Sequence, residues 1–152
     1  MTTTLTPYLS FNGTTREAYA FYEQALGAKI QTMMRYGDMP KMEGQSPECA
    51  GAPLVADAIM HACLELPGGA MLFAGDVPPH MMPAEGYGGI QGVMLALQYD
   101  TVDAAQSAFH ALSQGGKVTM PLAPMFWAKT FGMVTDRFGV DWGIGGEPIP
   151  MR

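Results

Sequence analysis

The sequence predicts an α+β protein of two tandem βαβββ modules, whose curved mixed sheets surround a cavity. One observation is an internal repeat, because a constant shift along the chain aligns residues of like character: Leu9 with Leu97, Phe21 with Phe109, Gly27 with Gly115, and Lys29 with Lys117. Another is the content of 19 glycines and 12 prolines, which favours turns and short strands over long helices. Each half has about four predicted strands, too few to close a barrel, so the two sheets are expected to pair.

The composition predicts one folded domain over residues 1–152, made of module 1 (1–77), a linker (78–89) and module 2 (90–152). Hydrophobic residues at 48% and charged residues at 14% are typical of a globular chain. The net charge of −6 argues against a nucleic acid partner. No signal peptide and no long apolar run is evident, so we expect no membrane partner, a cytoplasmic location and reduced thiols at Cys49 and Cys63.

Module 1 begins with a predicted strand over residues 5–11. A helix is expected next, with Thr14 and Glu17 forming a capping box and Gly27 ending the helix. Further strands are predicted over 28–36, 59–66 and 70–75, and a long loop over 37–57. The predicted linker is rich in proline and contains Met81 and Met82, whose adaptable side chains suit the covering of a cavity or a partner.

Module 2 repeats this plan from residue 90. A strand over 93–99 is followed by a helix capped by Thr101 and ended by Gly115 and Gly116, and then by a strand over 117–122. Residues 130–135 alternate with a period of two, Asp136 to Gly139 carry turn chemistry, and residues 140–144 form a last strand.

Four segments carry a resemblance to a known family, at residues 7–13, 21–28, 36–40 and 126–142. With the repeat, they resemble the vicinal oxygen chelate superfamily of glyoxalases, bleomycin-resistance proteins and dioxygenases, and its PhnB-like branch in particular. The resemblance implies paired βαβββ modules, usually in homodimers that sometimes swap modules. Some PhnB-like sequences carry a methyltransferase label, but no glycine-rich loop follows an early strand here, so we do not expect that activity.

Metalloenzymes of this superfamily hold a divalent ion with His and Glu from the first, fourth, fifth and eighth strands. The resemblance places the first-strand position on Pro7, the fifth-strand position on Met94 or Leu95, and the eighth-strand position on or beside Gly143, none of which can bind a hard cation. On the fourth strand only Asp76, at its end, could contribute. We therefore expect no metal and no other cofactor.

A relocated site for one divalent metal ion is the alternative, using His61, Glu65 or Asp76. His61, Cys63 and Glu65 share one face of a predicted strand, but one strand rarely supplies a complete site. The favoured interpretation of this face is a partly exposed polar surface with one buried thiol.

Aromatic side chains supply the candidate ligand-binding site, because flat rings suit planar or cationic ligands. Ordinary core and dimer packing explains the same residues equally well. The candidates are Tyr8, Phe11, Tyr36, Trp127, Phe131 and Trp142, with Lys129 placed to meet an anionic group.

The sequence thus predicts a dimeric small-molecule-binding protein without the usual metal site. The alternatives are a metal-dependent lyase, isomerase or dioxygenase with a relocated metal site, and a purely structural dimeric protein. No nucleophile motif is evident, and Asp136 is better explained as a turn-capping carboxylate than as a general acid or base.

Overall fold

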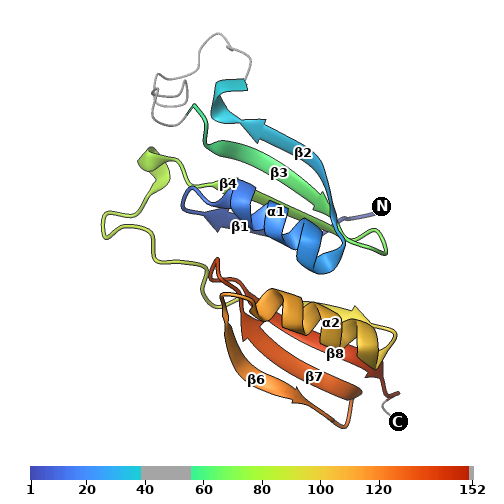
Figure 1. Ribbon diagram of the computed structural model, residues 1–152. Coiled ribbons are helices and arrows are strands. Elements are labelled where there is room, and N and C mark those ends of the chain that lie inside the picture. The colour runs from blue at the N-terminus through green and yellow to red at the C-terminus, as the bar shows by residue number, and fades with distance from the viewer. Residues whose placement is uncertain (39–55, 151–152) are drawn as a thin grey trace. The chain divides into compact units, whose positions relative to one another are not determined.

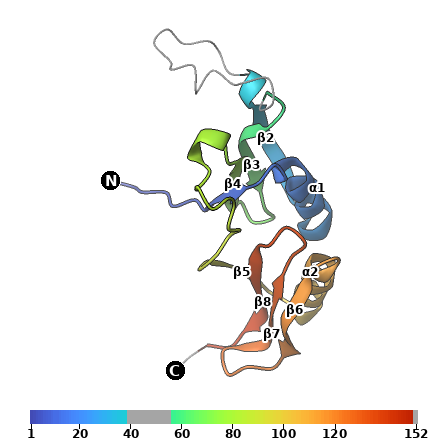
Figure 2. The same cartoon turned by 90° about the vertical axis from the view of Figure 1, so that its left-hand side faces the viewer.

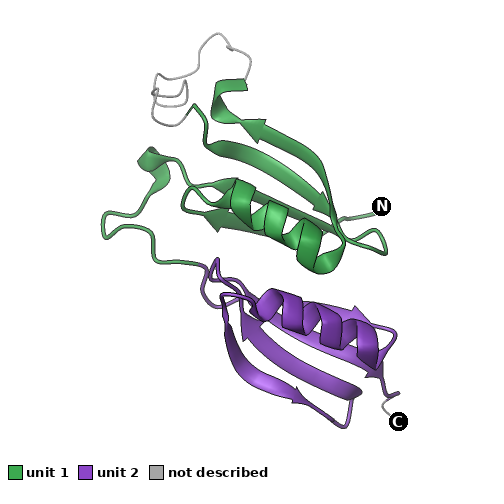
Figure 3. Cartoon of the chain, viewed as in Figure 1, with its two compact units in different colours: residues 1–89 green, residues 90–152 purple. Residues whose placement is uncertain are grey.

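The computed structural model describes residues 1–38 and 56–150. The chain divides into two compact units, residues 1–89 and residues 90–152 (Figure 3). Each unit holds one α-helix and one four-stranded mixed sheet, which confirms the predicted α+β plan of two βαβββ modules. The predicted linker, 78–89, falls inside the first unit, and the organisation of both units as a single domain stays a prediction.

Unit 1 contains a sheet in the order β1-β4-β3-β2, in which β1 and β4 are parallel and the other pairs are antiparallel (Figure 1). Its elements are β1 (Tyr8–Phe11), α1 (Thr15–Leu26), β2 (Lys29–Arg35), the 3-10 helix η1 (Tyr36–Asp38), β3 (Ile59–Glu65), β4 (Met71–Asp76) and the 3-10 helix η3 (Pro79–Met81). Most of the predicted loop, including Cys49, lies outside the described residues.

Helix α1 covers one face of this sheet, and the segment that carries η3 lies on the other side (Figure 2). Successive side chains of β1 point to opposite faces of the sheet, so Leu9 and Phe11 are buried while Tyr8 and Ser10 are exposed. Tyr19 is fully buried, and its hydroxyl donates a 2.7 Å hydrogen bond to the Leu72 carbonyl. The face of the sheet opposite α1, which we call the open face, therefore carries Tyr8 and Ser10.

Unit 2 repeats the topology of unit 1, with strand order β5-β8-β7-β6 and a parallel β5–β8 pair. Its elements are β5 (Met94–Tyr99), α2 (Val102–Ser113), β6 (Lys117–Ala123), β7 (Ala128–Thr135) and β8 (Asp141–Pro148). The helices α1 and α2 have 12 residues each. Within 1–38 and 56–150, no helix has the length and apolar character needed to span a membrane.

The two helices begin differently. The predicted cap of α2 is confirmed, because the Thr101 hydroxyl accepts a 3.1 Å hydrogen bond from the Ala104 amide. The predicted capping box of α1 is wrong, since the Thr14 side chain makes no capping hydrogen bond. The Asp76 carboxylate takes over that role from the end of β4, and accepts the Thr15 amide at 3.0 Å. A tertiary contact has replaced the local one.

The turn between β7 and β8 forms as predicted. Gly139 has a φ of 85°, and the Asp136 carboxylate accepts the amides of Phe138 at 2.8 Å and Val140 at 3.0 Å. The other oxygen of Asp136 accepts the indole N–H of Trp142 at 2.8 Å. Trp142 is 1% exposed, so it is a core residue held by the turn.

We predict that Asp76→Asn destabilises the protein. Both carboxylate oxygens of Asp76 accept hydrogen bonds, so in either orientation the asparagine amide would place its NH₂ group against a donor of Thr15 or Ile59. Urea unfolding should show a loss of about 2–3 kcal/mol in the free energy of unfolding. Asp57→Asn is the matched control, since the Asp57 side chain is 92% exposed and pairs only at the surface with Arg35. Equal unfolding midpoints for the two variants would show that the Asp76 contacts do not hold unit 1 together.

Candidate functional site

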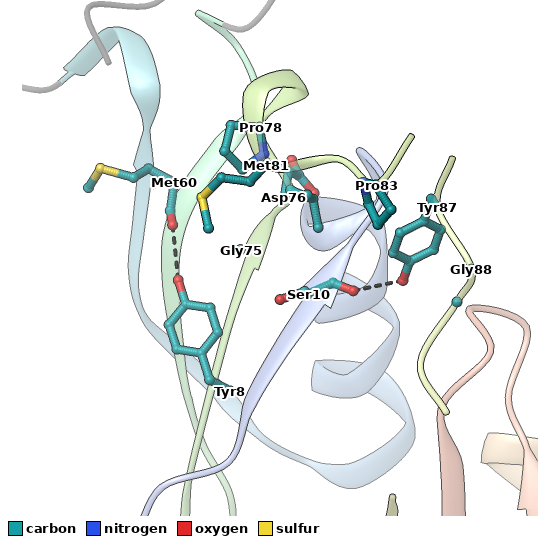
Figure 4. A pocket seen from close by; sticks show the side chains of 12 residues that line it. Tyr8, Ser10, Met60, Gly75, Asp76, Pro78, Met81, Pro83, Tyr87 and Gly88 are labelled. Atoms are coloured by element: carbon teal, nitrogen blue, oxygen red, sulfur yellow. Dashed lines mark hydrogen bonds between the residues drawn. The ribbon is translucent and has the colours of Figure 1, made fainter. Parts of the chain in front are cut away.

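Unit 1 contains a pocket of about 420 Å³ on the open face of its sheet (Figure 4). The strands contribute Tyr8 and Ser10 from β1, Met60 from β3, and Gly75 and Asp76 from β4. The segment after β4 contributes the other walls, which include Val77, Pro78, Met81, Pro83 and Tyr87. The pocket is therefore built between the open face and residues 77–89.

Tyr8 stands among other rings on the open face. Its ring lies 5.7 Å from that of His61 and 6.3 Å from that of Phe73, which in turn lie 5.0 Å from each other. Tyr8 is 50% exposed, so one side of the ring remains accessible. Burial of the rest raises the pKa of the Tyr8 phenol above its usual value, and the group is therefore a neutral phenol at physiological pH.

Gly75 provides the space in which the Tyr8 hydroxyl sits. The hydroxyl donates a 3.0 Å hydrogen bond to the Met60 carbonyl, passing over β4 at Gly75 (Figure 4). A Cβ atom at position 75 would lie 2.8 Å from the Tyr8 oxygen and 2.6 Å from the Met60 oxygen, too close for either atom. Glycine is thus required here for the close approach of a side chain and a backbone carbonyl, and not for its φ.

The segment 77–89 is fastened to β1 at both of its ends. The Val77 amide donates to the Phe11 carbonyl at 2.8 Å, and the Tyr87 hydroxyl donates to the Ser10 carbonyl at 2.7 Å. Between them, the Met81 side chain extends toward Gly75 (Figure 4). Burial raises the pKa of Tyr87, which keeps this phenol neutral as well. The segment predicted as a linker therefore forms the cover of the pocket.

Asp76 forms the back of the site, and its carboxylate is held there by three hydrogen bonds. Its carboxylate accepts the Thr15 amide at 3.0 Å, the Thr15 hydroxyl at 2.7 Å and the Ile59 amide at 2.8 Å. The backbone carbonyl of Asp76 also accepts the Tyr36 hydroxyl at 3.2 Å. The side chain is 6% exposed, so the carboxylate is a buried negative charge held by donors on the α1 side of the sheet.

The structure does not bring the proposed metal ligands His61, Glu65 and Asp76 together. His61 lies beside Tyr8, with Nδ1 3.4 Å from the hydroxyl, and Glu65 accepts the Gln31 side-chain amide at 2.7 Å. Across residues 1–38 and 56–150, no three His, Cys, Asp or Glu side chains gather as a metal site would require. Between His61 and Glu65, Cys63 is buried, and this burial raises the pKa of its thiol.

Two predicted ligand-binding aromatics of unit 1 have other roles. Phe11 is completely buried under α1, because its position in β1 has the opposite parity to that of Tyr8. Tyr36 is half-buried and contacts the Asp76 carbonyl, but it does not line the pocket. Of the unit 1 candidates, Tyr8 alone is among the residues that line the described pocket.

The ligand-binding candidates of unit 2 also include both partly exposed and buried side chains. Trp127 is half-buried, with its ring 5.6 Å from that of Phe131, whereas Trp142 belongs to the core. Lys129 is exposed and forms an ion pair with Glu147. This ion pair occupies the lysine that was expected to meet an anionic group.

Gly143, where the resemblance places a metal ligand, lies on the sheet face opposite α2. A Cβ atom there would lie 3.0 Å from the Met94 sulfur and 3.2 Å from the Phe131 ring. Met94 itself occupies one of the two candidate positions for the fifth-strand metal ligand. The side chains at these positions do not fit a hard divalent cation, which prefers nitrogen or oxygen donors.

Sequence reasoning missed several residues that line the pocket. Ser10 could have been found, because it shares a strand face with Tyr8. Gly75 carried a signal too, since a glycine inside a strand often marks a close approach. Tyr87 had none, because its contact with β1 spans 77 positions of the chain.

Comparison with known proteins agrees with this architecture. Protein YjdN of Escherichia coli (strain K12) is 35% identical over 142 residues, which cover 92% of each chain. The crystal structure of protein PA1353 from Pseudomonas aeruginosa is 42% identical, with a TM-score of 0.82 over 96% of this chain and 98% of that one.

A Bacillus cereus protein described as a putative 3-demethylubiquinone-9 3-methyltransferase, PhnB protein, superposes with a TM-score of 0.70. It covers 95% of this chain and 99% of its own, but at 23% identity it shows the fold alone. Residues 4–144 match one family over nearly the whole chain. Together with the relatives, this match shows that the chain belongs to the Glyoxalase/Bleomycin resistance protein/Dioxygenase superfamily.

Proposed function

We propose that this protein binds a small molecule in the unit 1 pocket. The observation that carries the proposal is the combination of a pocket of about 420 Å³ with a cover, residues 77–89, fastened to β1 by the Val77 and Tyr87 hydrogen bonds. Ligand sites of proteins are typically concave, largely apolar and equipped with a few fixed polar groups. The two phenols and the proline and methionine side chains here have that character.

We further propose that binding proceeds without the metal site of the superfamily's metalloenzymes. The proposal is supported by the residues at the corresponding positions, where Pro7, Met94 and Gly143 offer no nitrogen or oxygen side-chain donor. Asp76, at the end of the fourth strand, already accepts three hydrogen bonds. The side chains of this site are therefore suited to binding and orienting a ligand.

Filling the pocket should abolish binding. The neutral fluorescent probe N-phenyl-1-naphthylamine should bind at one site per chain, with a saturable rise in fluorescence, because the pocket offers it proline and methionine side chains to contact. Ser10→Phe places a ring in the pocket and should weaken binding about tenfold or more. Gln24→Phe adds the same ring on the exposed face of α1 and should leave binding unchanged.

Two results of this titration would contradict the proposal. One is a wild-type protein that shows no saturable binding. The other is a Ser10→Phe variant that binds the probe as well as Gln24→Phe does while remaining folded by circular dichroism.

We also propose that the protein forms homodimers. Unit 2 exposes several large apolar side chains, which supports self-association: Val93, Met94, Val118 and Phe126. Sedimentation equilibrium at micromolar concentration should give twice the chain mass of 16.3 kDa. A mass of one chain across the whole concentration range would contradict the proposal.

A further inference from the structure

We propose that the ligand of the unit 1 pocket is an organic cation, a protonated primary amine attached to an apolar body. This inference rests on the proposed function, because it assigns a chemical class to the ligand of the same pocket.

Apart from the Ser10 hydroxyl, which can donate as well as accept, the polar side chains of the pocket present hydrogen-bond acceptors. The Tyr8 hydroxyl gives its proton to the Met60 carbonyl, and the Tyr87 hydroxyl gives its proton to the Ser10 carbonyl. Each phenol oxygen keeps lone pairs, and each carbonyl oxygen can accept a second hydrogen bond. Since both phenols stay neutral and have already donated, a ligand that brings its own donors is favoured, and an ammonium group brings three.

The charge of the lining favours the same ligand. Among the described residues that line the pocket, Asp76 is the one with a formal charge, and none is a lysine or arginine. Its carboxylate is buried, so its negative charge is poorly screened by water. The carboxylate lies on the α1 side of the sheet, so its charge acts on the pocket through β4 and not by contact. It repels an anionic ligand and attracts a cation, and the phenol lone pairs act in the same direction. The net charge of −6 adds a long-range attraction for cations.

The remaining surface suits an apolar body next to the ammonium group. Pro78, Met81 and Pro83 supply aliphatic and thioether surface from the cover. The ring of Tyr8 is half exposed beside this surface, and the face of an aromatic ring attracts cations. Figure 4 shows Tyr8 and Tyr87 approaching the pocket from different sides, with Met81 extending toward Gly75. An arylalkylamine can therefore place its cation among acceptors and its ring against the cover.

Three compounds of matched shape test the charge preference, each competing with N-phenyl-1-naphthylamine at pH 8. They are 2-phenylethylammonium, the neutral 2-phenylethanol and the anionic 3-phenylpropionate. The ammonium compound should displace the probe at a concentration about tenfold or more below that of the alcohol, and the carboxylate should be the weakest.

The double variant Tyr8→Phe, Tyr87→Phe keeps both rings but removes the acceptor oxygens. Because loss of the Tyr87 hydroxyl also loosens the cover, the change is compared between two ligands. The affinity for 2-phenylethylammonium should fall about fivefold or more beyond any change in the affinity for 2-phenylethanol. Tyr99→Phe is the matched control, because Tyr99 is a half-buried tyrosine in β5 that does not line the pocket, and it should bind the ammonium compound as wild type does.

The outcomes separate the two proposals. In one outcome the probe binds to the wild type and not to Ser10→Phe, but the alcohol or the carboxylate displaces it as well as the ammonium compound does. This outcome overturns the cation proposal and leaves the proposed function standing. A double variant that lowers the ammonium affinity no more than the alcohol affinity also overturns the cation proposal. If neither the probe nor any of the three compounds binds, both proposals fall.

Discussion

The buried carboxylate of Asp76 is the constraint on which unit 1 depends. It joins the first residue of α1, the first residue of β3 and the last residue of β4 through the Thr15 and Ile59 amides and the Thr15 hydroxyl. A buried charge is tolerated only where donors satisfy it, so these three elements must meet at one point. The first amide of helix α1 is consequently capped by Asp76 and not by a side chain that precedes the helix.

The same strand end also builds the pocket, because neighbouring residues of a strand point to opposite faces. Asp76 turns toward α1, while Gly75 leaves room on the open face for the Tyr8 hydroxyl and the Met60 carbonyl. Any shift of β4 would disturb the helix start and the pocket together. The rigid part of the site thus comes from the sheet, and the cover, with Met81 at 68% exposure, supplies its adaptable part.

The sequence predicted what depends on local patterns. Period-two alternation located β1 and β7, and the glycine and aspartate chemistry of residues 136–139 located a turn. What depends on distant contacts was missed: the capping of α1 by Asp76 spans 61 positions. Aromatic character identified Tyr8 but could not separate it from Phe11 and Trp142, because rings serve cores and ligand sites alike.

The position of a bound molecule can be measured by intermolecular nuclear Overhauser effects between N-phenyl-1-naphthylamine and the protein labelled at methionine methyl groups and tyrosine rings. Contacts from the probe to Met81, Tyr8 and Tyr87 are the predicted result, because these side chains line the unit 1 pocket. Contacts confined to unit 2 side chains such as Met94 and Met133 would contradict it, since they would place the bound molecule on the other unit.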